Sequence, residues 1–136
     1  MSRIFIDTHA HLDGEEFRQD IEEVVARARK AGVSKAFIPA IDLKSIDSVY
    51  AVCRRFPHFA YPMIGLHPEE VRADRHEVLA EMKRILAISM ATDSDASNET
   101  CSFTEKTKQK YAPSPIAIGE IGLDYYWSRE FENEQL

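Results

Sequence analysis

The sequence predicts an α/β fold in which a parallel β-sheet is covered by helices. Short apolar segments alternate with longer segments that have apolar residues at helical spacing. The short segments are apolar along most of their length, which is typical of strands in a parallel sheet with helices packed on it. At 136 residues, the chain is about the size of one ordinary domain.

Four short apolar segments are predicted to be strands. The first holds a nearly continuous apolar run, and the second is interrupted by Pro39 near its end. These predicted strands are Arg3 to Thr8, Lys35 to Ile41, Tyr61 to Leu66 and Ile116 to Ile121.

Apolar residues at helical spacing separate the strands. The second helix is expected to end before Pro57, and Gly32 is a suitable stop for the first. The three patterns run from Phe17 to Ala28, from Ile46 to Cys53 and from Val78 to Leu86. A further helical pattern starts in the last residues of the sequence.

A polar stretch from about Ala91 to Pro113 lies between the third helix and the fourth strand. It is rich in Thr, Ser, Asp, Asn, Glu and Lys and has few large apolar residues. We therefore expect a mobile surface insertion at 91–113 within a single domain that spans residues 1–136.

The net charge of −6 argues against a basic surface that binds nucleic acid through its phosphates. It does not exclude a nuclease, because bound divalent metals can supply the positive charge that phosphate chemistry needs. No apolar run approaches the roughly 20 residues of a membrane span, and the N-terminus does not resemble a secretion signal. We expect a cytoplasmic protein without a membrane partner, in which Cys53 and Cys101 are free thiols.

His9 and His11 follow the first predicted strand, at the edge where parallel α/β folds build active sites. Strand side chains alternate, so the two imidazoles should project to the same side and could reach one divalent cation. The alternative is two ordinary histidines near a turn. Asp7 and Asp13 flank the pair and could orient an imidazole. For Asp13, capping of the following helix is the preferred interpretation.

His67 lies in the motif Gly65-Leu66-His67-Pro68, directly after the third predicted strand. It should face the same region as His9 and His11, although a packed structural histidine would give the same pattern. We predict that His67 lies near the metals or holds substrate. Glu69 and Glu70 come next, and adjacent glutamates at a helix start usually reflect the helix dipole rather than catalysis.

Glu120 lies at the end of the fourth predicted strand, between Gly119 and Gly122. A carboxylate at the end of an apolar strand needs a partner, because burial of an unpaired charge is very costly. That partner could be a metal, or it could be an arginine or lysine. If it is a metal, the two oxygens of the carboxylate could bridge it to a second metal. Asp124 follows and could contact substrate.

Three motifs in this order resemble the TatD family of metal-dependent hydrolases. They are Phe5-Ile6-Asp7-Thr8-His9-Ala10-His11-Leu12-Asp13, Ile64-Gly65-Leu66-His67-Pro68 and Ile118-Gly119-Glu120-Ile121-Gly122-Leu123-Asp124-Tyr125-Tyr126. The resemblance extends from Ile4 to Leu136 except for the polar insertion. It implies a (β/α)₈ barrel and a deoxyribonuclease, often a 3′–5′ exonuclease.

The resemblance also implies roles for individual residues. His9 and His11 would bind one metal, Glu120 would bridge to a second, and His67 would contact substrate, as Asp124 could. The cofactor would be two divalent ions, Mg²⁺, Mn²⁺ or Zn²⁺, and two imidazoles favour a transition metal over Mg²⁺. The catalytic residue would lie on later strands.

A complete barrel of this type needs about 250 residues, and this chain supplies four of the eight strands. A half barrel exposes two sheet edges and one sheet face. We therefore expect part of a longer protein, with the other half supplied by a longer chain or by self-association. The expected function is hydrolysis of phosphodiester bonds in DNA, with RNA as a further candidate substrate. The alternatives are an inactive fragment and a related enzyme that cleaves amides or lactones.

Overall fold

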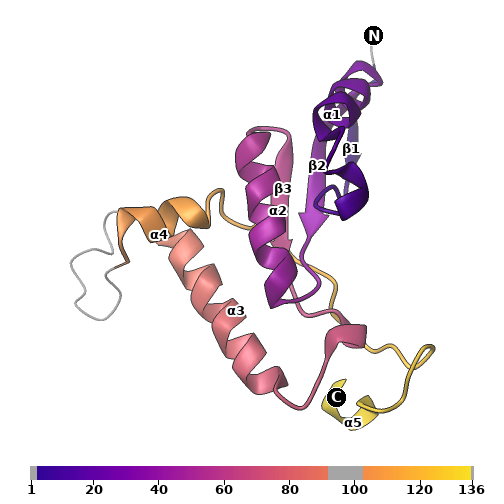
Figure 1. Cartoon of the computed structure of the whole chain (residues 1–136), viewed down its shortest axis with the longest axis vertical. Helices are drawn as coiled ribbons and strands as arrows, with labels where there is room; N and C mark the ends of the chain where they lie inside the picture. The colour runs from indigo at the N-terminus through magenta and orange to yellow at the C-terminus, as the bar shows by residue number, and fades with distance from the viewer. Residues whose placement is uncertain (1–2, 92–102, 136) are drawn as a thin grey trace.

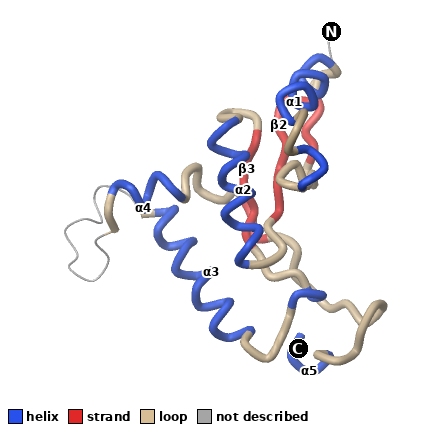
Figure 2. Tube along the Cα trace, viewed as in Figure 1, coloured by secondary structure: helices blue, strands red, loops and turns tan. Residues whose placement is uncertain are grey.

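The computed structural model describes residues 3–91 and 103–135 of the chain. Four parallel strands form one sheet in the order β1-β2-β3-β4, which is also their order along the chain. Figures 1 and 2 show β2 and β3 side by side within it. Each connection therefore crosses from one end of the sheet to the other, as the predicted α/β fold requires. The strands are β1 (Phe5–Asp7), β2 (Val33–Pro39), β3 (Ala60–Ile64) and β4 (Ala117–Ile118).

The three predicted helices are present, with small differences at their ends. Asp42 begins the second helix through a capping box, in which its Oδ1 accepts from the Ser45 amide at 2.7 Å. Phe17, which the helical pattern included, lies in a separate 3₁₀ turn before the first helix. The elements are η1 (Glu15–Phe17), α1 (Ile21–Lys30), α2 (Leu43–Arg55), η2 (Pro68–Glu70), α3 (Arg75–Met90) and α5 (Glu132–Gln135).

A short helix, α4 (Glu105–Lys110), lies within the stretch predicted to be a polar insertion. The Thr104 hydroxyl accepts from the Thr107 amide at its first turn. Tyr111, which directly follows the last residue of α4, is buried and packs edge-to-face on Tyr50 at 5.4 Å between ring centroids. The second half of the predicted insertion thus includes a helix and joins the core. Residues 92–102, and Cys101 with them, lie outside the described residues.

Helices α1 and α2 pack against one face of the sheet and α3 packs on α2, and the hydrophobic core lies between these elements (Figure 1). Side chains of β2 and β3 alternate, so Ala36 and Ile38 point into this core. Phe37 of β2 and Tyr61 of β3 occupy the opposite face and pack edge-to-face at 6.3 Å. Cys53 of α2 is a buried free thiol, and burial raises its pKa to about 12.

The two outer strands are exposed, as expected for a sheet with open edges. Ile6 of β1 is 52% exposed and Ile118 of β4 is 64% exposed. In the inner strands, by contrast, Ile38 and Ala60 are 0% and 1% exposed. The described part of the chain contains no helix with the length and apolar character needed to cross a membrane.

This difference in burial predicts unequal effects of truncating two isoleucines. Ile38→Ala should lower the free energy of unfolding by about 2–5 kcal/mol, because it removes core contacts and leaves a cavity. Ile118→Ala should change the free energy of unfolding by no more than about 0.5 kcal/mol, because its side chain is already solvated. Urea denaturation of both variants measures this, and equal losses would contradict the described packing.

Candidate metal centre

Three side chains that the sequence predicts as metal ligands come together beyond the ends of β1 and β4. The Nε2 atoms of His9 and His11 lie 3.2 Å apart. Oε1 of Glu120 lies 2.6 Å from the His9 nitrogen and 3.5 Å from the His11 nitrogen. The recorded ionic partners of Glu120 are thus two imidazoles, rather than the arginine or lysine that was the alternative.

This arrangement fits a divalent cation. Donor atoms bound tetrahedrally to zinc at ~2.0–2.1 Å would lie ~3.3 Å apart, close to two of the three separations. The third, between His9 and Glu120, is a hydrogen-bond distance. The His9 and His11 side chains are 52% and 44% exposed, so water or substrate could reach an ion held here. Three protein ligands with an accessible further position are typical of catalytic rather than structural metal sites.

The histidine pair lies in the loop that follows β1 and is held to the end of β2. The Ala10 amide donates to the Phe37 carbonyl at 3.0 Å, so residues on either side of Ala10 point to the same face. Asp7 Oδ1 accepts from the His9 backbone amide at 3.1 Å. The Asp7 carboxylate therefore fixes the backbone of His9, whereas the sequence suggested that it would accept a hydrogen bond from an imidazole.

Glu120 is placed by a close approach of the chain after β3 to the chain after β4. The Gly119 amide donates to the Ile64 carbonyl at 3.0 Å. A Cβ on Gly65 would lie 1.8 Å from the Gly119 carbonyl oxygen, and a Cβ on Gly119 would lie 2.1 Å from Cε of Met63. The Gly65 contact is with backbone, so only glycine fits there, whereas the end of the Met63 side chain would have to move to admit a Cβ on Gly119. Glu120 itself has a φ of 44°, a left-handed conformation that is uncommon for residues other than glycine.

Asp13 does not cap a helix, so that interpretation of the sequence was wrong. Gly14 occupies the cap position of η1 and Asp20 that of α1. Asp13 Oδ2 instead accepts from the Ser48 hydroxyl at 2.9 Å, which fixes the chain after His11 to α2. The sequence gives no signal for this bond, because the two residues are 35 positions apart.

His67 lines an open cavity of about 500 Å³ together with His11 and Glu120. Its Nδ1 accepts from the Glu69 backbone amide at 3.1 Å, so in the neutral ring the proton is on Nε2, which can donate. Five carboxylates line the same cavity and make it suited to cations: Asp13, Glu16, Glu69, Glu70 and Glu120. Glu69 and Glu70, which the sequence analysis attributed to the helix dipole, therefore line the cavity beside the candidate metal ligands.

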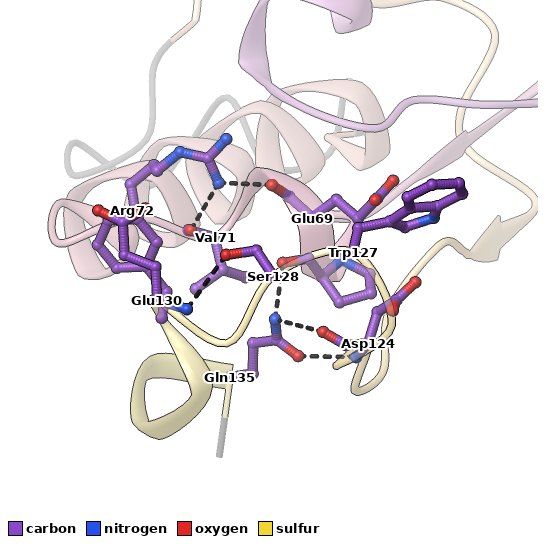
Figure 3. A pocket seen from close by; sticks show the side chains of 10 residues that line it. Glu69, Val71, Arg72, Asp124, Trp127, Ser128, Glu130 and Gln135 are labelled. Atoms are coloured by element: carbon purple, nitrogen blue, oxygen red, sulfur yellow. Dashed lines mark hydrogen bonds between the residues drawn. The ribbon is translucent and has the colours of Figure 1, made fainter.

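Asp124 lies apart from His67, on a second and smaller pocket (Figure 3). Its Oδ1 accepts from the Tyr126 amide at 2.8 Å, and its backbone is bonded to Gln135. Sequence reasoning missed Gln135, Trp127 and Arg72, which also line this pocket. A glutamine or arginine in a polar stretch carries no local signal, and the indole could be noticed only as the end of an aromatic run.

The family model for TatD related DNases matches residues 6–136 of this sequence. The chain belongs to the TatD family. The TatD homologue YjjV from Escherichia coli K12 has a solved structure with a TM-score of 0.67 and 29% sequence identity. The match covers 96% of this chain and 42% of YjjV, so the four strands and their helices correspond to part of a TatD-type barrel.

Curated members of the TatD family show the same partial coverage. The uncharacterized metal-dependent hydrolase YabD of Bacillus subtilis is 30% identical over 93% of this chain and 40% of its own length. The 3′-5′ ssDNA/RNA exonuclease TatD of Edwardsiella piscicida is 23% identical over 88% of this chain and 37% of its own length. The chain spans about 40% of the length of these relatives.

The contact between Gly65 and Gly119 predicts a loss of metal affinity from a residue that is not a ligand. Gly65→Ala should weaken binding of Mn²⁺ or Zn²⁺ by about tenfold or more, because the added methyl group must displace the chain that carries Glu120. Isothermal titration calorimetry measures the affinity.

Ala51→Gly is the matched control for this variant. It also changes a single methyl group, at an exposed position on α2 that does not line the cavity. The control should bind metal as the unchanged chain does. Equal affinities of the Gly65→Ala variant and the unchanged chain would contradict the proposed placement of Glu120.

Proposed function

We propose that this TatD chain contributes to a metal-dependent phosphodiesterase that acts on nucleic acid, with His9, His11 and Glu120 as metal ligands. The observation that carries the proposal is the convergence of these three donors beside an open, acidic cavity. The names of relatives support the reaction class, since they include metal-dependent hydrolases and a 3′-5′ ssDNA/RNA exonuclease. We favour single-stranded DNA as substrate, cleaved from the 3′ end.

The donor set favours particular ions. Two imidazoles and one carboxylate suit Zn²⁺ or Mn²⁺ better than Mg²⁺, which prefers oxygen ligands. Glu120 has a second carboxylate oxygen, which would allow it to bridge to a second ion. A divalent ion here would acidify a water molecule and stabilise negative charge on the phosphate.

His67 would act on the phosphate rather than on the metal. Its Nδ1 is held by the Glu69 amide, which leaves Nε2–H as a donor for a phosphate oxygen. A neutral donor of this kind orients the substrate and would favour the charge that develops on the phosphate in the transition state. The Glu69 amide therefore positions the imidazole that would bind substrate.

The catalytic base would come from the remainder of the TatD barrel. The relatives are more than twice as long as this chain, and β1 and β4 have exposed edges where further strands could pair. Three donors leave two ions short of ligands, which residues on those strands would complete. A longer chain or a second copy would supply them.

Removal of the histidine pair tests the proposal. The chain should bind Mn²⁺ or Zn²⁺ in calorimetry, and when completed by the remainder of a TatD barrel it should degrade single-stranded DNA only with metal present. The His9→Ala, His11→Ala double variant should lose both properties by about 100-fold or more, because one carboxylate alone holds such ions weakly. His76→Ala, at an exposed position on α3, is the control and should retain both. Undiminished binding or cleavage in the double variant would refute the assigned ligands, and bound metal without cleavage by the completed barrel would refute the phosphodiesterase.

A further inference from the structure

A second pocket lies beside the metal centre, between η2 and the chain that follows β4 (Figure 3). It has a volume of about 200 Å³, smaller than the ~300–1,000 Å³ clefts that hold drug-sized ligands. Glu69 lines both this pocket and the cavity that holds His11, His67 and Glu120. The two spaces are therefore neighbours across one 3₁₀ turn.

The side chains of this pocket combine aromatic and polar character. Trp127 lines it with its side chain 72% exposed, and Tyr126 packs on the indole edge-to-face at 4.7 Å between centroids. Figure 3 shows Trp127 and Asp124 on one side and Arg72 on the other. The Arg72 guanidinium donates to the Val71 carbonyl at 2.8 Å and lies 5.5 Å from the Phe131 ring centroid. The pocket thus offers an aromatic surface, a fixed cation and carboxylate acceptors.

Gln135 joins the two walls of the pocket. Its Nε2 donates to the Pro68 carbonyl in η2 and to the Asp124 carbonyl, both at 3.1 Å. Its Oε1 accepts from the Asp124 amide at 2.7 Å. The amide group of Gln135 therefore holds the two walls of the pocket together before any ligand enters. Because the walls are already ordered, binding loses less conformational entropy.

We propose that this pocket binds one unpaired nucleobase of a single-stranded nucleic acid whose phosphate lies at the metal centre. An exposed indole offers a π-face on which any base can stack, and such stacking is a general device of single-strand binding proteins. Asp124 and Glu130 can accept hydrogen bonds from the amino groups of a base. The small volume admits one ring system rather than a base pair. This inference rests on the proposed function and adds selectivity for single strands.

Trp127 is the only tryptophan of the sequence, so intrinsic tryptophan fluorescence reports on this pocket alone. The probe is a short oligothymidylate with phosphorothioate linkages, which resists hydrolysis, added to the full chain with Zn²⁺. An abasic oligomer of the same length and linkage is the matched control ligand. The base-bearing oligomer should quench the fluorescence by stacking on the indole, and the abasic oligomer should leave it unchanged.

Affinities measured by fluorescence anisotropy of dye-labelled oligomers complete the test. Trp127→Ala should weaken binding of the base-bearing oligomer by about 5- to 150-fold, and Trp127→Phe by less, because phenylalanine keeps a ring for stacking. Neither variant should change binding of the abasic oligomer. Equal binding of both oligomers, with unchanged Trp127 fluorescence, would overturn the base pocket and leave the proposed phosphodiesterase standing. Binding of neither oligomer would overturn both proposals.

Discussion

The close approach of the Gly65 and Gly119 backbones is the constraint on which the candidate centre depends. It brings the ends of β3 and β4 together without intervening side chains, and it sets Glu120 opposite the histidines that follow β1. A methyl group on Gly65 would meet the Gly119 carbonyl oxygen at a distance that atoms do not adopt. The ligand set is therefore assembled by main-chain packing at the carboxyl edge of the sheet, where α/β barrels place their active sites.

Charge gives this region its second defining property. The chain carries a net charge of −6, and five carboxylates line the cavity beside the histidines. A phosphate would be repelled from such a surface unless cations were bound, so metal and substrate binding should be coupled. The adjoining pocket offers the complementary part of a nucleotide site, because it places an indole and a guanidinium beside its carboxylates.

The sequence predicted the parts of the fold that depend on local pattern. Strand alternation placed His9 and His11 on one side, and the end of an apolar strand identified Glu120 as a carboxylate that needs a partner. Contacts between distant residues could not be predicted in this way. Gln135 bonds to Pro68 across 67 positions, and Asp13 was misassigned because Ser48 is 35 positions away. The helix α4 was missed because a polar composition hides the apolar anchor that Tyr111 provides.

X-ray absorption spectroscopy of the zinc-loaded chain tests the ligand assignment most directly. If His9, His11 and Glu120 hold the ion, the zinc edge should show two imidazole groups in the first shell, with nitrogen and oxygen atoms at ~2.0–2.1 Å. The His9→Ala, His11→Ala double variant should lose the multiple scattering that is characteristic of imidazole. A first shell of oxygen alone in the unchanged chain, or sulfur from a cysteine, would contradict the proposed centre.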